Sequence, residues 1–418
     1  MRDCPQVWLA SAALVLTTAC GDATSPPPSG EAGGAGTGAS GGSSAGTAAG
    51  GQAGGVSVGG AGASGSSAGG SGGTAVGGAT AAGGTGGSSG ASVGGGGAAG
   101  SGGAAGSGGA AGGTGDSLPW RPLGVTAPKA RHEHSFKASA ADAEVSFNDE
   151  TQMTIFDNRA PKLVGKLVLP FGGLGSTAGT FGGQGEFCAR RGFHVLAIAT
   201  YEDFDILLGD PDFFGDARRT VFEGEKFTNK GKFANIEMGP ADGVRRRTQK
   251  ALQYLHKTYP EEDWGYYLEQ DGTVRWSDVI FTGMSHGASN AARFAMLVRA
   301  SRAVSIAGPR DNVCTSLNES NCGGVVATWL GEEPKTPRDR FFAITGKTDD
   351  QHTQHLFAMQ SLGYSGAPVE VSGAQAPYGG SHRLVAAGGH SEFCGQAAYD
   401  EACNYAFDVP MENRAGVK

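Results

Sequence analysis

The sequence predicts an α/β fold, a mostly parallel central sheet with helices on both faces, over residues 116–418. Short runs of β-branched and aromatic residues alternate there with segments that have apolar residues at helical spacing. One run, residues 279–282, leads into the pentapeptide Gly283-Met-Ser-His-Gly287, which opens directly into an alanine-rich helical segment. A serine between a strand and a helix in this way holds its hydroxyl clear of the sheet.

Residues 1–20 have the features of an export signal. The apolar run over residues 7–16 is too short for a permanent membrane-spanning helix, and small residues precede Cys20. The segment resembles a bacterial lipoprotein signal, which implies that Cys20 becomes the lipidated first residue of the mature protein. We expect a lipoprotein of the cell envelope that meets the membrane through this lipid only, or a secreted protein if Cys20 is not lipidated.

Residues 21–115 are a Gly/Ala/Ser-rich tract that contains most of the chain's 75 glycines. Between Ala23 and Gly115, Glu31 is the only charged residue and no aromatic residue occurs. Such a segment cannot bury enough apolar surface to offset the entropy of ordering it, so we expect a disordered linker. The pattern Gly-x-Ser-x-Gly recurs in this tract without a strand before it or a helix after it, and composition alone explains those matches.

Charge and glycine patterns argue against two kinds of ligand for residues 116–418. This domain has 31 of the 32 basic and 37 of the 40 acidic residues, a formal charge of −6, so we expect no nucleic-acid partner. The glycine loop at residues 172–175 does not form a clean Gly-x-Gly-x-x-Gly pattern, and no Gly-Lys-Ser/Thr follows it. We therefore expect no nucleotide and no other cofactor.

Cysteine usage indicates an oxidising compartment. Apart from the cysteines of the signal, the chain has two closely spaced pairs, Cys314 with Cys322 and Cys394 with Cys403. Each pair could close a short loop, and we expect both to be disulfides. Cys188 lies in an apolar, helix-like stretch and is expected to be a free, buried thiol.

The sequence of the first part of the domain predicts lead-in strands, followed by two strands that one crossover helix connects. Residues 118–160 contain one or two lead-in strands, and we expect residues 131–134 to lie in a solvated loop, because their histidine spacing does not match a metal-binding helix. Residues 162–171 are a buried strand that runs into the glycine loop. A helix that ends before Gly192 and a strand over residues 193–200 complete a βαβ unit.

A long insertion over residues 201–240 follows that strand. Open α/β sheets bind ligands at the carboxyl ends of their strands, so we expect a substrate-facing loop or lid. A calcium site among its aspartates remains an alternative to a solvated acidic loop. These aspartates are Asp203, Asp205, Asp210, Asp212 and Asp216. Asp242 is expected to cap the following helix.

Three further strands are predicted at residues 302–308, 340–346 and 382–388. His390 follows the last strand directly, whereas its rival His382 lies at the start of that strand and so at the opposite edge of the sheet. His352 and His355 are expected to face solvent on the helix after Asp350. A metal cluster of these histidines with Asp350 is the disfavoured alternative, and we expect no metal.

The order of Ser285, an acid after a later strand and His390 resembles the α/β-hydrolase superfamily. The glycine loop and the alternating strands and helices strengthen the resemblance, which covers about residues 150–400. It implies that Ser285 is a nucleophile activated by His390. The spacing of Gly346 and Asp349 resembles the superfamily's placement of the acid, which favours Asp349 over the adjacent Asp350.

Charge that develops on the substrate carbonyl needs an oxyanion hole, for which we expect the backbone N–H of His286 and that of Gly173 or Leu174. The prediction is an exported serine hydrolase acting on small-molecule or polymer esters through an acyl-enzyme. A serine peptidase or acyltransferase on the same fold, and a non-catalytic surface binding protein, remain alternatives. The oligomeric state is not predicted.

Overall fold

The computed structural model describes residues 122–201, 209–226, 238–313 and 325–418. The signal with Cys20, the linker, the Cys314/Cys322 pair, Asp203 and Asp205 lie outside these ranges. No helix in the described ranges is long and apolar enough to cross a membrane.

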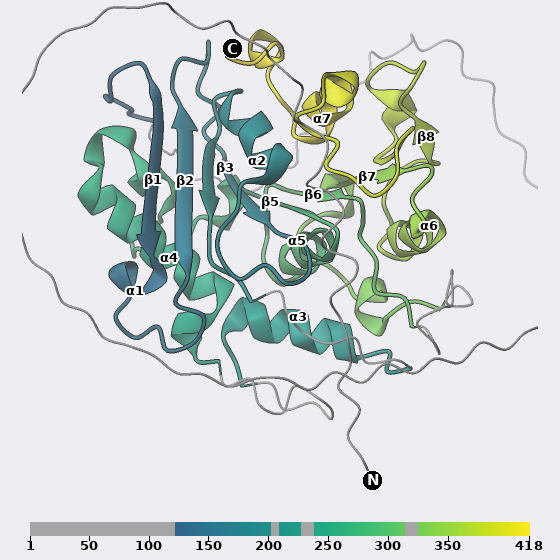
Figure 1. Ribbon diagram of the computed structural model, residues 1–418, viewed down its shortest axis with the longest axis horizontal. Coiled ribbons are helices and arrows are strands. Elements are labelled where there is room, and N and C mark those ends of the chain that lie inside the picture. Colours follow the sequence, from purple (N-terminus) through teal and green to yellow (C-terminus); the bar gives the residue numbers. More distant parts are fainter. Residues whose placement is uncertain (1–121, 202–208, 227–237, 314–324) are drawn as a thin grey trace, which may run out of the picture. The chain divides into compact units, whose positions relative to one another are not determined.

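The described residues form a nine-stranded sheet in the order β1-β2-β4-β3-β5-β6-β7-β9-β8, with β1 at one edge and β8 at the other (Figure 1). β2 pairs antiparallel with β1 and β4, and every other pairing is parallel. The strands are β1 (Arg131–Lys137), β2 (Thr151–Asp157), β3 (Leu167–Phe171), β4 (His194–Ala197), β5 (Val279–Met284), β6 (Arg302–Ile306), β7 (Phe341–Gly346), β8 (Val369–Glu370) and β9 (Arg383–Ala386).

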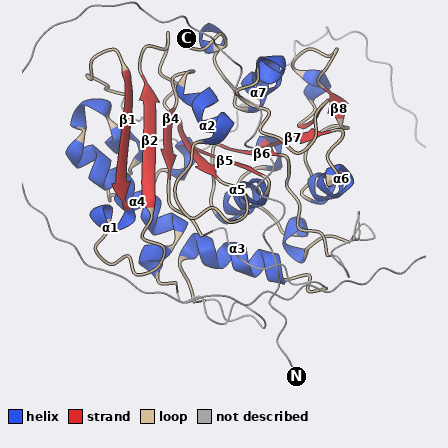
Figure 2. Ribbon diagram, in the orientation of Figure 1, coloured by secondary structure: helices blue, strands red, loops and turns tan. Residues whose placement is uncertain are grey.

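Helices cover both faces of this sheet (Figure 2). Alternate residues of β3 show the two layers, because side chains along a strand point to opposite faces. Leu167 and Leu169 share a buried cluster with α3, α4, α5 and α6, whereas Val168 packs in a second cluster with α2 and α7. The helices are α1 (Ala138–Ala141), α2 (Gly182–Ala189), α3 (Phe213–Glu223), α4 (Val244–Thr258), α5 (His286–Leu297), α6 (His352–Ser361) and α7 (Asp400–Ala406). The predicted fold class, with a mostly parallel sheet between helices, is confirmed.

Two expectations about the ends of the sheet and its helices are wrong. Residues 131–134 belong to β1 and pair with β2 instead of lying in a loop. Asp242 does not cap α4, whose N-cap is Gly243. The Asp242 carboxylate instead accepts the backbone N–H groups of Ser146 and Phe147, at 3.0 and 2.9 Å, and thereby fixes the segment before β2.

The insertion after β4 contains a helix, where a loop was expected. α3 buries Phe213 and Phe222 in the core, because its apolar residues recur on one face. Asp210 accepts the backbone N–H groups at the start of this helix. Within the described part of the insertion, Asp210, Asp212 and Asp216 do not gather into a metal-binding cluster.

Candidate active site

Ser285 lies in the sharp turn between β5 and α5. Its backbone has φ 58° and ψ −118°, a conformation that L-residues rarely adopt. The turn is held by the Ser285 N–H, which donates to the Ile306 carbonyl of β6 at 2.9 Å, and by the Ala288 N–H, which donates to the Ser285 carbonyl at 3.0 Å. Strain at one residue, fixed by neighbouring hydrogen bonds, is a frequent feature of functional sites.

The two glycines of the pentapeptide allow this turn to form. A Cβ on Gly283 would lie 2.2 Å from the Gly287 carbonyl oxygen, and a Cβ on Gly287 would lie 2.4 Å from the carbonyl oxygens of Phe171 and Gly172. Any side chain at either position would force strand and helix apart. The close approach also brings the end of β3, and the glycine loop after it, next to Ser285.

The glycine loop supplies backbone donors beside the serine. A Cβ placed on Gly173 would lie 4.0 Å from the Ser285 Cβ, so the two residues are in van der Waals contact range. The N–H groups of Gly173 and Leu174 donate no hydrogen bond within the described chain. The Leu174 side chain is about half exposed, at 51%. The predicted oxyanion hole would use one of these donors together with the His286 N–H at the first residue of α5.

Asp349 and His390 form a hydrogen-bonded pair. His390 Nδ1 lies 2.8 Å from Asp349 Oδ2, and the second carboxylate oxygen accepts the Gln351 N–H at 2.9 Å. Asp349 is buried while the side chain of His390 is 29% exposed. Asp350, the alternative acid, is exposed.

The charge state of Asp349 fixes the tautomer of His390. Burial raises the pKa of Asp349, but the hydrogen bonds from His390 and the Gln351 N–H, with the nearby histidines, outweigh burial and lower this pKa to about 2. An ionised carboxylate only accepts, so Nδ1 of His390 donates. In the neutral imidazole this arrangement leaves Nε2 as the acceptor, which is the form that a general base requires.

Neither the Ser285 hydroxyl nor His390 Nε2 has a hydrogen-bond partner among the residues that the structure describes. Catalytic hydrogen bonds are often long in a free enzyme and shorten only when substrate binds. The serine and the histidine both belong to loops at the carboxyl ends of parallel strands, β5 and β9, and those ends meet at one edge of the sheet.

Close backbone contacts hold the acid and the histidine loop together. A Cβ on Gly346 would lie 2.2 Å from the Gly389 carbonyl oxygen, so only glycine permits the approach of the two loops. The Lys347 N–H donates to the Ala386 carbonyl at 2.8 Å, and the Thr348 N–H donates to the Gly388 carbonyl at 3.1 Å. The pairing of Asp349 with His390 is therefore set by the backbone.

The histidine loop is also anchored on its far side. The predicted disulfide between Cys394 and Cys403 is confirmed, and it joins this loop to α7. Glu392 accepts the N–H of Gly183 at the start of α2, at 2.6 Å. Cys188 is free and buried as expected, and burial raises the pKa of its thiol well above the ordinary value.

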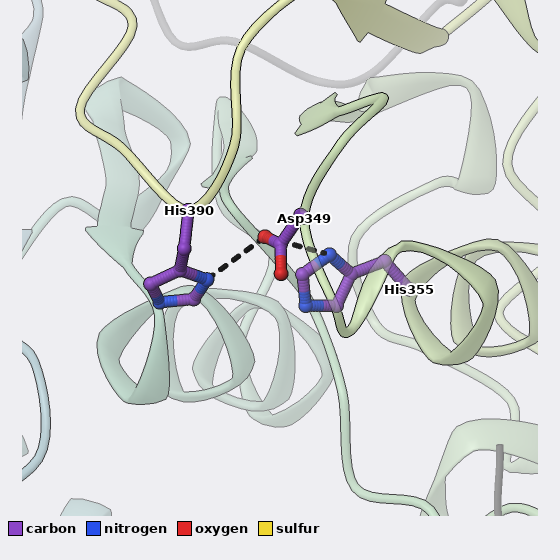
Figure 3. Close-up of side chains that lie close together, drawn as sticks. All are labelled: Asp349, His355 and His390. Carbon is purple, nitrogen blue, oxygen red and sulfur yellow. Dashed lines mark hydrogen bonds and ion pairs between the residues drawn. The ribbon is translucent and has the colours of Figure 1, made fainter. Parts of the chain in front are cut away.

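The expectation that His355 faces solvent is wrong. Its side chain is fully buried, and its Nδ1 lies 3.8 Å from Asp349 Oδ2 and 2.9 Å from the Thr345 hydroxyl. Figure 3 shows His355 and His390 on opposite sides of the Asp349 carboxylate. Burial lowers the pKa of His355 to about 3, although the charge of Asp349 acts in the opposite direction. His355 is thus a neutral side chain that lies against the Asp349 carboxylate on the side opposite His390.

The spacing of residues along α6 does not distinguish its two histidines. His355, Ala358 and Met359 are buried, and His352 lies three residues before His355 and seven before Met359, on the same side of the helix. His352 is nevertheless partly exposed. The burial of His355 is therefore visible only in the folded structure.

Asp349, His355 and His390 are also the described residues that could hold a metal ion, with one ligand atom of each within 4.8 Å of the others. The short hydrogen bond between Asp349 and His390 means that a cation would have to replace the proton on Nδ1. The set of side chains thus matches an acid that orients a base at least as well as it matches a metal site. His382 lies at the opposite edge, where its Nδ1 contacts the Phe341 carbonyl at the start of β7.

His286 is held by an arginine of α3. The Arg218 Nη1 lies 3.2 Å from His286 Nε2, and burial together with the arginine charge lowers the pKa of His286 well below its ordinary value. The imidazole is therefore neutral and accepts through Nε2. Sequence reasoning assigned a role to the His286 backbone but did not predict this contact.

Comparison with known proteins gives only distant likenesses. No family model matches the sequence, and no curated protein does. Similar solved structures include the S-formylglutathione hydrolase from Agrobacterium tumefaciens, with 11% identity, a TM-score of 0.39, and coverage of 68% of this chain and 98% of that chain. Esterase B from Lactobacillus rhamnosis has 13% identity and a TM-score of 0.37, covering 70% and 87% of the two chains. The fluorophosphonate-binding serine hydrolase FphF from Staphylococcus aureus has 12% identity and a TM-score of 0.36, covering 67% and 99%.

Proposed function

We propose that this protein is a serine hydrolase that cleaves carboxylic esters. The observation that carries the proposal is the 2.8 Å hydrogen bond between Asp349 and His390 at the edge of the sheet where Ser285 occupies its strained turn. A nucleophile, a base and a group that orients the base are the components that this chemistry requires.

In the proposed reaction His390 Nε2 takes the hydroxyl proton of Ser285 as the serine oxygen attacks the ester carbonyl carbon. The C–O bond to the alcohol then breaks, and the alcohol leaves with the proton that His390 returns. Water, deprotonated by the same Nε2, attacks the acyl-enzyme and releases the carboxylic acid. Asp349 stays ionised throughout and stabilises the imidazolium that forms in each half-reaction.

The negative charge on the carbonyl oxygen is assigned to the backbone donors beside Ser285. The His286 N–H and one N–H of the glycine loop, at Gly173 or Leu174, are the proposed pair. Removing a single donor from such a site costs roughly 3–4 kcal/mol of transition-state stabilisation in related acyl transfer. Backbone donors need no reorganisation during the reaction, because the strand and the helix already fix them.

We also propose that the enzyme acts outside the cytoplasm, as a lipoprotein attached through Cys20 or as a secreted protein. The disulfide between Cys394 and Cys403 supports an oxidising compartment. Residues 21–115 would act as a linker between the lipid and the domain that begins near residue 116. Metabolic labelling with a palmitate analogue tests the anchor: incorporation that is lost in Cys20→Ala supports it, and equal incorporation contradicts it.

Labelling by a fluorophosphonate tests the hypothesis that the protein is a serine hydrolase with Ser285 as its nucleophile. Wild type should be labelled covalently, and Ser285→Ala should not be labelled while keeping the melting temperature of the wild type. Ser277→Ala is a control serine at the opposite end of β5, because Ser277 is exposed in the turn that precedes this strand. Equal labelling of wild type and Ser285→Ala would identify a different nucleophile.

Two alternatives remain within the same fold. A peptidase or an acyltransferase would use the same acyl-enzyme, and a panel of acyl esters, short peptides and acceptor alcohols separates them by product. A non-catalytic binding protein would give no labelling at Ser285. The free donors of the glycine loop favour acyl chemistry over binding alone, since such donors are needed where an oxyanion develops.

A further inference from the structure

We infer that Arg310 recognises a carboxylate on the substrate, so that the preferred ester is one that also carries a free carboxyl group. This inference rests on the proposed ester hydrolysis and names its substrate class. It starts from the loop after β6, which passes along the first turn of the nucleophile helix.

The backbone of this loop is fixed beside Ser285. The end of β6 accepts the Ser285 N–H, and a Cβ on Gly308 would lie 3.3 Å from the Ser285 carbonyl oxygen. The Arg310 N–H donates to the Ser289 hydroxyl at 2.9 Å. Arg310 therefore begins at the same edge of the sheet as the serine and within one helical turn of it.

The guanidinium of Arg310 is half-buried but makes no hydrogen bond, ion pair or ring contact with a described residue. Burial lowers the pKa of Arg310, while the charges of Asp311, Asp350 and Asp349 act in the opposite direction. A guanidinium has five N–H donors, and removing it partly from water without acceptors for them costs free energy. A ligand that accepts these hydrogen bonds would offset that cost.

The acids around Arg310 are engaged elsewhere or lie in solvent. Asp311 makes two 2.7 Å bonds to Arg218. Asp349 accepts from His390 and the Gln351 N–H, and Asp350 is exposed. Among the described residues, these acids therefore leave the Arg310 guanidinium without a partner, on a loop whose backbone lies beside Ser285.

The local charge favours a monovalent ligand. Arg218 neutralises Asp311, which leaves Asp349 and the exposed Asp350 as the acids that act on Arg310. Beside these acids a phosphate with two negative charges is repelled more strongly than a single carboxylate, whose two oxygens match the planar fork of one arginine. The geometry does not determine whether the recognised carboxylate belongs to the acyl part or to the alcohol part of the ester. The choice of substrates in the test distinguishes these two positions.

The test compares two pairs of esters that differ by one carboxylate. Ethyl hexanoate and monoethyl adipate place it on the acyl side, and propyl hexanoate and the hexanoyl ester of glycolate place it on the alcohol side. We expect wild type to have the higher kcat/KM for the charged member of one pair. In Arg310→Gln this preference should fall roughly tenfold to a hundredfold, as expected for a hydrogen bond to a charged group. Arg310→Lys should fall between the two, because it keeps the charge and loses the fork.

Arg299→Gln is the matched control. Arg299 is exposed and precedes β6, so it lies at the opposite end of the strand that Arg310 follows. This variant removes the same charge and should leave both preferences as in wild type. A wild type without preference in either pair overturns the inference. Equal losses for charged and neutral esters in Arg310→Gln also overturn it, because they would mean that Arg310 acts on Asp349 instead of the substrate.

Failure of ester hydrolysis can be distinguished from failure of the anion site. If wild type cleaves neither pair, the same esters are used as competitors of the fluorophosphonate. The rate at which the fluorophosphonate labels Ser285 is then measured in their presence. Slower labelling with monoethyl adipate than with ethyl hexanoate, in wild type but not in Arg310→Gln, supports the carboxylate site on its own. Equal labelling rates in both proteins reject it.

Discussion

Arg218 and Asp311 form a bidentate ion pair with both side chains buried, at 2.7 Å for each of the two hydrogen bonds. The pair joins α3 to the loop after β6. Arg218 also donates to the Asn290 side chain and contacts His286, so its charge is shared among three segments that surround the first turn of α5. Trp329 adds a donor to the same carboxylate, at 2.9 Å.

Breaking this pair on one side should be more harmful than removing it altogether. Arg218→Met leaves the Asp311 carboxylate buried without its cation, which costs roughly 3–5 kcal/mol in the free energy of unfolding. Asp311→Leu should have a similar effect, and the double variant should lose clearly less than the sum. Urea unfolding of the four proteins measures the coupling. Additive losses would show that the two charges do not stabilise each other.

Asp349→Asn should lower kcat by about 10⁴, because an amide can hold His390 in the wrong tautomer. Asp350→Asn should change kcat by less than about tenfold, an effect near the roughly 1 kcal/mol of ordinary exposed substitutions. Ester turnover of both variants, at equal melting temperature, decides the assignment. An active Asp349→Asn beside an inactive Asp350→Asn would reverse it.

His355 should make stability fall as the solution is acidified. Its pKa is lowered to about 3 in the folded protein, so the unfolded chain, with a pKa near 6.5, binds the proton first as pH falls. Between pH 7 and pH 5 this difference costs on the order of 2 kcal/mol of folding free energy. Urea unfolding at several pH values should show that loss in wild type and a correspondingly smaller slope in His355→Asn.

His256→Asn is the control for that measurement, because His256 is exposed at the end of α4. Its stability should vary with pH as in wild type. His194 and His286, whose pKa values are also lowered, remain in both variants, so their contribution to the pH dependence cancels in the comparison. Identical slopes in wild type and His355→Asn would mean that His355 does not stay neutral in the fold.

Opening the disulfide should weaken the histidine loop before it affects the rest of the fold. Cys403→Ser removes a bridge that closes nine residues, which costs about 2–3 kcal/mol in the loop-entropy model. Since Cys394 follows His390 by four residues, we expect kcat to fall more than the affinity for a substrate analogue. Cys188→Ser, at the free cysteine, controls for loss of a sulfur atom. A variant with normal kcat would show that Glu392 and the Gly346 contact suffice to hold the loop.

Alanine at two glycines should separate folding from catalysis. Gly283→Ala places a Cβ 2.2 Å from a carbonyl oxygen and should prevent the turn from forming, with loss of soluble protein. Gly173→Ala meets only the Ser285 Cβ, at 4.0 Å, and should fold normally. Its methyl group projects toward the nucleophile, so turnover of large acyl groups should fall more than turnover of acetyl esters. Circular dichroism and an acyl-length series provide the two readouts.

The sequence predicted the elements that carry strong local signals. The pentapeptide around Ser285, the glycine loop and His390 after the last strand each combine a residue type with a strand boundary, and the structure places them at one edge of the sheet. Two-residue β8 has too little periodicity to be recognised, and α3 was missed because the acidic residues before it suggested a loop. A local sequence pattern is enough to predict a long helix or strand. A short one forms only because adjacent segments pack against it, and the local pattern does not show those segments.

The contacts behind the site could not be predicted because they join distant segments. Arg218 meets Asp311 across 93 residues, and Asp242 meets Ser146 across 96. Nothing in the sequence around either aspartate distinguishes a helix cap from a buried partner. The sequence also does not distinguish Arg310 from other arginines, because its proposed role depends on Asp311 and Asp349 being paired with other residues. Only the packed structure shows which charged side chains are already satisfied.

The order of the strands has a consequence for how the protein matures. The serine belongs to β5 at the centre of the sheet, whereas the histidine loop follows β9 and is fastened to α7 near the C-terminus. A ribosome therefore releases the segment with His390 long after the one with Ser285. In the proposed mechanism, the nascent domain contains the serine without its base during synthesis, and hydrolysis begins only after the segment with His390 has docked. Truncation before Cys403 should likewise abolish the proposed hydrolysis while leaving most of the sheet intact.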